Sequence, residues 1–114
     1  MARDLALEAW LRQALAGEPE VAEKAMFGGV AWLIGGNLAC AARDDGMLAR
    51  VGPERNAWAL SKPGVAPMEM RGRPLAGWVR AGPAADQPTR RQLLDAALAF
   101  VRALPAKTTR SRRR

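Results

Sequence analysis

The 114-residue sequence has no histidine and one cysteine, Cys40. Without histidine, neither a Ser-His-Asp triad nor a histidine metal site can form. A single cysteine makes no internal disulfide, and Cys40 stands in an apolar stretch, which favours a buried small side chain over a reactive thiol. No apolar run approaches the ~20 residues of a membrane span, and the N-terminus lacks a signal-peptide cleavage pattern. We therefore expect a cytoplasmic, bacterial-type protein without membrane contact.

Motifs for nucleotide binding and acid–base chemistry are also missing. Gly28-Gly29 and Gly35-Gly36 follow expected strands, but a phosphate loop must open into a helix, and here more strand follows. Asp44 and Asp45 stand directly before Gly46, which is typical of a hairpin turn rather than of a catalytic carboxylate pair. The sequence predicts no catalytic residue, no metal site and no cofactor, and hence no enzyme.

The positive charge is concentrated at the C-terminus. The formal net charge is +7. Removing the five basic residues of the last eight positions leaves 13 basic against 11 acidic residues, a net charge of +2 that does not clearly gather on one face. These five residues are Lys107, Arg110, Arg112, Arg113 and Arg114. We expect residues 1–106 to form the domain and residues 107–114 a disordered basic tail.

The chain from residue 24 to 51 indicates four short strands joined by glycine turns. Gly-Gly, Gly-Asn and Asp-Gly pairs supply the positive φ angles of tight hairpins. Strands joined in this way must be antiparallel, because parallel pairs need long crossovers. The predicted strands are residues 24–27, 30–34, 38–42 and 47–51.

Three helices are predicted around these strands, at residues 3–16, 55–60 and 88–104, from apolar side chains at helical spacing or a proline at the first turn. In the first helix, Asp4, Glu8 and Arg12 are expected on the polar side. Between this helix and the first strand, the acidic group Glu18, Glu20 and Glu23 is expected to be a solvated linker.

A second hairpin is predicted at residues 66–70 and 77–80, with residues 71–74 as its turn. Prolines at both of its ends suggest edge positions in the sheet. The element order is α-β-β-β-β-α-β-β-α. The predicted fold class is therefore α+β, a two-layer antiparallel β-sheet with helices on one face.

Arginines flank this hairpin. Arg71, Arg73 and Arg80 surround Trp78 in the sequence, and arginine beside an aromatic ring can hold phosphate and stack a base. The alternative is that these arginines are solvated edge residues that oppose aggregation, with Trp78 in the core.

The residues named so far resemble the N-terminal domain of the TfoX/Sxy family. The structural motifs that carry the resemblance are Met26-Phe27-Gly28-Gly29 and Gly72-Arg73-Pro74, supported by residues 50–54 and 77–79. The likeness spans roughly residues 24–107 and is greatest to free-standing single-domain members. It implies a secretion-chaperone-like α+β fold and a link to the regulation of competence and transcription, and it brings no catalytic residues.

Two functions remain open from the sequence. The first is a non-enzymatic regulatory or adaptor domain that acts through protein contacts, with a homodimer among the candidate assemblies, because surplus Trp and Met can cover an interface. The alternative is a nucleic-acid-associating accessory protein that uses its basic tail and the arginines around Trp78.

Overall fold

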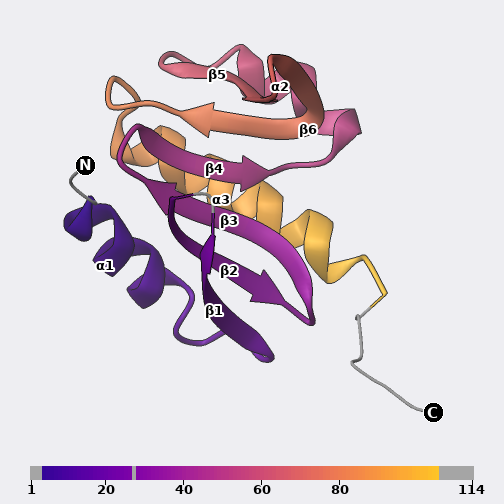
Figure 1. Cartoon of the computed structure of the whole chain (residues 1–114). Helices are drawn as coiled ribbons and strands as arrows, with labels where there is room; N and C mark the ends of the chain where they lie inside the picture. Colours follow the sequence, from indigo (N-terminus) through magenta and orange to yellow (C-terminus); the bar gives the residue numbers. More distant parts are fainter. Residues whose placement is uncertain (1–3, 27, 106–114) are drawn as a thin grey trace.

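The computed structural model describes residues 4–26 and 28–105 (Figure 1). Within these ranges the predicted element order is confirmed, with a short 3₁₀ turn before the second helix. Phe27 and the predicted basic tail lie outside the described residues. The elements are α1 (Leu5–Ala14), β1 (Val21–Met26), β2 (Gly29–Ile34), β3 (Asn37–Arg43), β4 (Gly46–Arg50), η1 (Pro53–Arg55), α2 (Asn56–Leu60), β5 (Val65–Met70), β6 (Arg73–Ala81) and α3 (Gln87–Arg102).

The six strands form one antiparallel sheet in the order β1-β2-β3-β4-β6-β5. Gly35 and Gly36 have φ angles of 58° and 82° between the paired residues Ile34 and Asn37. Two consecutive positive φ angles are the requirement of a type I′ hairpin turn, as the glycine pair predicted.

The second hairpin differs from its prediction. Its turn contains only Arg71 and Gly72, with φ angles of 56° and 78°, and Arg73 already pairs with Met70. The prediction that both strands are edges is also wrong, because β6 lies between β4 and β5. Pro74 is tolerated in β6 because β4 pairs only with its residues 78–81, so no ladder bond to β4 is lost.

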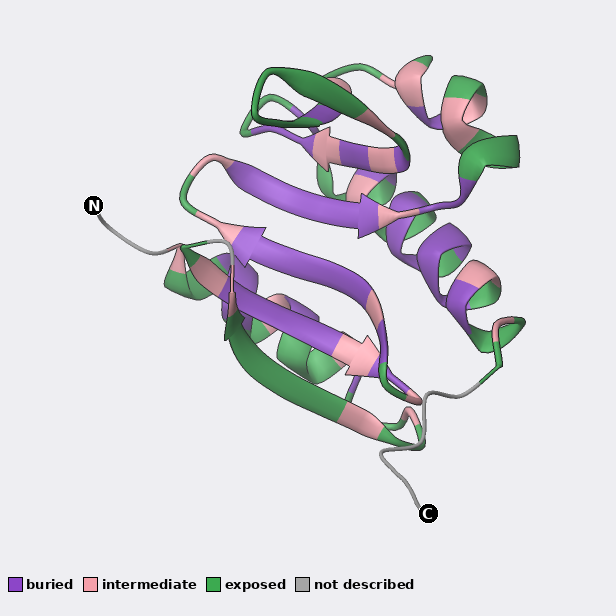
Figure 2. Cartoon of the chain, turned by 45° about the vertical axis from the view of Figure 1, so that its right-hand side comes forward, coloured by how far each residue is buried: buried purple, intermediate pink, exposed green. Residues whose placement is uncertain are grey.

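All three helices pack on one face of the sheet, as predicted. Leu7 and Leu11 of α1, Ala59 of α2, and Leu93 and Leu94 of α3 belong to one buried cluster. Figure 2 shows the buried side of α3 turned toward the strands and its exposed side turned outward. The sheet contributes Val30, Trp32, Ala39, Cys40, Met47, Ala49 and Val79 to the same cluster.

The acidic residues near the N-terminus have more specific positions than the sequence indicated. Glu8 is 3 % exposed, so its predicted position on the polar side of the helix is wrong. Asp4 instead caps α1, accepting a hydrogen bond from the Leu7 N–H at 3.0 Å.

The predicted acidic linker is confirmed for Glu20, which is exposed between α1 and β1, but wrong for Glu23. Glu23 lies in β1, where its carboxylate accepts two hydrogen bonds from the Arg12 guanidinium at 2.9 Å and one from the Trp32 indole at 3.1 Å. Glu18 pairs with Arg102 of α3. Glu18 and Glu23 therefore join α1, β1, β2 and α3 rather than marking a free connection.

Candidate binding face

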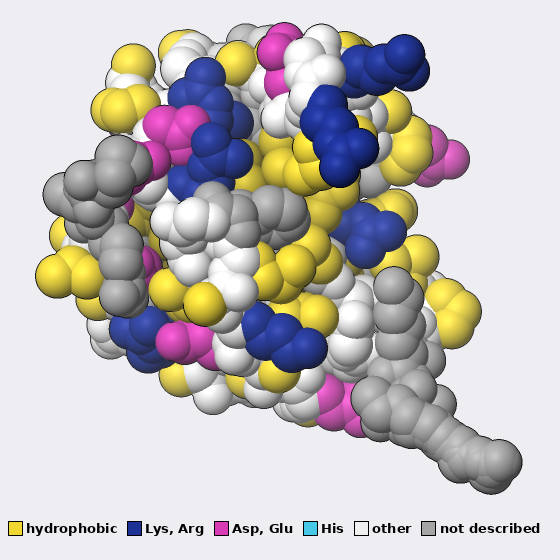
Figure 3. Space-filling model, in the orientation of Figure 1, with side chains coloured by type: hydrophobic (Ala, Val, Ile, Leu, Met, Phe, Trp, Pro, Cys, Tyr) yellow, Lys and Arg dark blue, Asp and Glu magenta, His cyan; other side chains and the backbone are white. Residues whose placement is uncertain are grey.

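The sheet face opposite the three helices, called the open face, carries a second apolar cluster. Ala31, Ala41, Leu48 and Met68 are its buried members. Figure 3 shows this face, with hydrophobic side chains among separate basic groups. The half-buried side chains packed against the cluster are Met26, Leu38, Leu75 and Trp78.

Gly77 explains why both Leu75 and Trp78 belong to the open face. Strand side chains alternate between faces, so residues three apart normally point in opposite directions. Gly77 has a φ angle of 87°, which interrupts that alternation. A Cβ atom at Gly77 would lie 2.9 Å from the Gly52 carbonyl carbon and from the Pro53 nitrogen. The kink is therefore restricted to glycine both by φ and by the contact with η1.

Basic residues surround the apolar cluster of the open face. Lys24 is two positions from Met26, Arg43 is two from Ala41, and Arg50 is two from Leu48. Residues two apart in a strand share a face. By the same rule Arg80 lies on the side of Trp78, and Arg73 on that of Leu75. Lys24, Arg43, Arg73 and Arg80 are called the open-face cations below. The Arg50 guanidinium is not among them, because it donates to the Leu38 carbonyl oxygen and lies against the Phe100 ring of α3.

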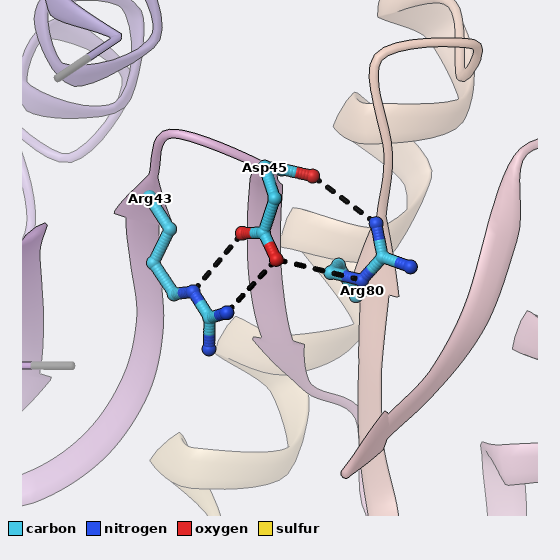
Figure 4. Close-up of polar contacts among 3 residues, drawn as sticks. All are labelled: Arg43, Asp45 and Arg80. Atoms are coloured by element: carbon cyan, nitrogen blue, oxygen red, sulfur yellow. Dashed lines mark hydrogen bonds and ion pairs between the residues drawn. The ribbon is translucent and has the colours of Figure 1, made fainter. Parts of the chain in front are cut away.

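Asp45 holds two of these cations together (Figure 4). The Arg43 guanidinium donates two hydrogen bonds to its carboxylate, from Nε to Oδ1 at 3.0 Å and from Nη2 to Oδ2 at 2.8 Å. Nη1 of Arg80 donates to the Asp45 carbonyl oxygen at 3.1 Å, and its Nε lies 4.0 Å from Oδ2. The turn predicted at Asp44-Asp45 is present, but it also has this electrostatic role.

A hollow of about 320 Å³ lies beside this group. The side chains of Arg43 and Arg80 are 28 % and 33 % exposed, so both guanidinium groups still reach solvent. Two carboxylates, Asp45 and Glu69, line the hollow with these two arginines, so the formal charges of its lining balance. Its remaining walls are Leu48, Ala66, Pro67 and Met68.

The structure separates the three arginines that the sequence grouped around Trp78. Arg71 lies in the exposed β5–β6 turn, and Arg73 follows it at the start of β6. Arg80 lies seven positions further, roughly 23 Å along an extended strand. Arg73 and Arg80 share the open face but cannot contact the same phosphate. Trp78 packs against the apolar cluster, as the alternative predicted, while it remains partly exposed.

Two open-face cations were missed from the sequence: Lys24 and Arg43. The available signal was a spacing of two from apolar strand residues, which places a side chain on the same face as its neighbour. Because the net charge of the body is small, its cations were not expected to gather on one face. The predicted tail contacts, Lys107, Arg110, Arg112, Arg113 and Arg114, lie outside the described residues.

An apolar groove of about 570 Å³ lies between η1 and α3. Gly52 is required on its wall, since a Cβ atom there would lie 2.5 Å from Cδ1 of Phe100. The Arg50 guanidinium is 5.4 Å from the centre of the Phe100 ring, at a distance that permits a cation–π contact. Eight residues line this groove: Val51, Gly52, Pro53, Glu54, Arg55, Ala96, Ala99 and Phe100.

Cys40 is fully buried, as the sequence indicated. Burial raises the pKa of its thiol to about 12, so the group is neutral at pH 7. Among the described residues, no three Cys, Asp or Glu side chains gather in a way that suits a metal ion. No helix in the described ranges is long and apolar enough to cross a membrane.

Comparison with known families identifies a match over most of the chain. Residues 13–101 match the family model described as the TfoX N-terminal domain. This range contains all six strands, the open-face cations and the lining of the apolar groove. No curated protein and no solved structure matches the chain.

Proposed function

This chain belongs to the TfoX N-terminal domain family, and from that membership we propose a non-enzymatic regulatory or adaptor domain that acts through protein contacts in the bacterial cytoplasm. The resemblance stated above connects the family with the regulation of competence and transcription. In such a role the domain supplies a binding surface, and its effect depends on which molecule that surface holds.

The apolar groove between η1 and α3 is the observation that carries this proposal. Its walls are mainly carbon atoms, from Val51, Pro53, Ala96, Ala99 and Phe100. Covering such walls with apolar side chains of a partner protein removes them from water, at roughly 25 cal/mol per Å². Glu54 and Arg55 also line the groove and provide charges of both signs for a polar rim.

Two chemically distinctive side chains have structural environments that support a non-enzymatic role. The Cys40 thiol is neutral and enclosed, and a nucleophilic cysteine needs an accessible thiolate. The Asp45 carboxylate is engaged by Arg43 through two hydrogen bonds.

The groove can be blocked without altering the core. Ala99 is an exposed residue of α3, so Ala99→Arg fills the groove while the helix remains compatible with arginine. Gln92→Arg adds the same side chain at an exposed α3 position outside the groove and is the matched control. We expect affinity capture from native extract, with nuclease present, to recover the same proteins with the wild type and the control and to lose them with Ala99→Arg. Identical recovery with all three proteins would contradict the proposal.

A second copy of the chain is the simplest protein partner to test. Sedimentation velocity over a range of micromolar concentrations measures the monomer–dimer equilibrium directly. We expect a concentration-dependent shift toward a dimer that Ala99→Arg weakens. A monomer at every concentration would remove the homodimer from the proposal and leave the other protein partners to the capture experiment.

Nucleic-acid association is a second candidate function, and one specific observation favours it. The alternation of the strands places Lys24, Arg43, Arg73 and Arg80 on the open face, whereas Glu23 pairs with Arg12 on the helix side. A folded nucleic-acid-binding domain carries such a cluster on one face. The basic tail adds a sequence-independent attraction of its own.

A further inference from the structure

We propose that the open face binds single-stranded nucleic acid, with phosphates on the open-face cations and bases packed against its apolar cluster. This inference rests on the second candidate function above and specifies its site. It assigns binding roles to Lys24 and Arg43 in addition to Arg73 and Arg80.

The spacing of the cations suits an extended strand rather than a single anion. Lys24 and Arg80 lie in one cross-strand row, through the paired residues Ala31, Ala41 and Leu48. Four strand spacings of ~4.8 Å separate them by roughly 19 Å. Arg73 lies at the other end of β6 from Arg80. A bound strand must therefore extend over several nucleotides to neutralise these charges.

The surface between the cations selects single strands over duplexes. Trp78, Leu75, Leu38 and Met26 are half-buried there and present apolar area between the positive charges. Unpaired bases can stack on an indole or pack against aliphatic side chains, whereas a duplex offers a broad sheet mainly its phosphates. The apolar cluster would remain solvated under a duplex and be covered under a single strand.

Within the Arg43–Asp45–Arg80 group, contacts with Asp45 orient both arginines before a ligand binds. Asp45 binds Nε and Nη2 of Arg43, so this guanidinium is oriented before a ligand arrives. The Arg80 guanidinium is held at the same turn by the Asp45 carbonyl oxygen. Both guanidinium groups line a solvent-accessible hollow, and arginine N–H groups are suited to phosphate oxygens.

Binding of the full chain to labelled oligothymidylate of about 12 nucleotides tests the proposal, since single-strand sites span ~4–16 nucleotides. A duplex of the same length is the comparison ligand. The site variant is Arg43→Gln with Arg80→Gln, and the matched control is Arg91→Gln with Arg102→Gln, which removes two exposed, ion-paired charges of α3 away from the open face. Thermal unfolding of each variant checks that the fold is retained.

The site variant should weaken oligothymidylate binding at least tenfold at low salt, and the control should change it less than threefold. Loss of two phosphate contacts should also reduce the slope of log affinity against log salt by roughly 1.4. Trp78→Leu keeps an apolar side chain but removes the ring, so about a tenfold loss is expected. Trp58→Leu, on the helix side, is its control.

Two further measurements separate the open face from the tail. Deleting residues 107–114 should weaken single-strand and duplex binding alike, whereas the site variant should affect the single strand more strongly. Amide chemical shifts should change in β2, β3, β4 and β6 on addition of oligothymidylate, and not along α3.

Absence of binding at low salt, or equal affinity of the site variant and wild type, would overturn the proposal and leave the open face to a protein partner. The capture experiment at the apolar groove is unaffected by either result.

Discussion

The two faces of the sheet are built from alternate residues of the same strands, yet they differ in what covers them. On the helix face, Met47, Ala49 and Val79 are 0 % exposed beneath the helices. On the open face, Ala31, Ala41, Leu48 and Met68 are also buried, but the apolar residues packed around them are half-buried, and cations surround them. One face therefore supplies the stability of the fold, and the other retains surface for binding.

The largest expected effect on stability comes from a substitution on the helix face. Leu94→Ala removes a fully buried side chain from α3 and should lower the free energy of unfolding by about 2–5 kcal/mol. Leu38→Ala on the open face removes the same atoms from a half-buried site, and we expect about half that loss. Urea unfolding of both variants measures the contrast. Equal losses would show that the two faces contribute alike to stability.

Gly77→Ala tests the kink that places Leu75 on the open face. A positive φ in a non-glycine residue costs on the order of 1–3 kcal/mol, and the new Cβ would also lie 2.9 Å from backbone atoms of Gly52 and Pro53. Gly72→Ala is the control, because its φ angle is 78° but a Cβ there meets nothing within 4 Å. Thermal unfolding should show the larger loss for Gly77→Ala, and similar losses would indicate that the contact with η1 is unimportant.

Asp45→Asn removes a negative charge from the open face and so makes that face more positive. The pair with Arg43 is partly exposed, so its loss should cost no more than about 0.2–1 kcal/mol of stability. Removing one negative charge beside two open-face cations should tighten oligothymidylate binding a few-fold at low salt. Asp95→Asn, which breaks an ion pair on α3, is the matched control. Unchanged or weaker binding by Asp45→Asn would show that orientation of the arginines matters more than their net charge.

The smallest effect concerns the N-terminus of α3, on the helix side. Hydrogen bonds from the Thr89 side chain and backbone N–H lower the pKa of the exposed Asp86 carboxyl group. A pKa lowered in the folded state contributes stability above the unfolded value, near 3.9, and that contribution is lost as the pH falls through the folded pKa. Asp86→Asn should therefore reduce the melting temperature at pH 7 but not at strongly acidic pH. A pH-independent difference would contradict the assigned cause.

Local chemistry made much of the fold predictable. Glycine pairs located the hairpin turns because few other residues adopt positive φ angles. Apolar side chains at helical spacing located α3 because they form one stripe that faces the sheet. The start of β1 was missed for an equally physical reason. At an edge strand both side-chain faces and one row of backbone groups reach water, so charged residues such as Glu23 resemble a linker.

The candidate site was harder to predict from the sequence, because it depends on contacts between residues that are distant in the chain. Asp45 was correctly assigned to a turn, but its contact with Arg80 joins positions 35 apart. Arg73 was assigned to the hairpin turn at residues 71–74, whereas it already pairs with Met70 in the sheet. Neither the pairing of β4 with β6 nor the burial of Glu8 has a local signature, since both follow from how the elements pack.

The sheet order also sets an order of assembly. Strands β1 to β4 join through short turns, so each pairing closes a small loop at low entropic cost. β6 must instead reach β4 across the whole segment that contains α2 and β5, so this pairing closes a larger loop. The β5–β6 hairpin is thus the unit expected to dock last and to open first, and its amide protons should exchange with solvent sooner than those of β3.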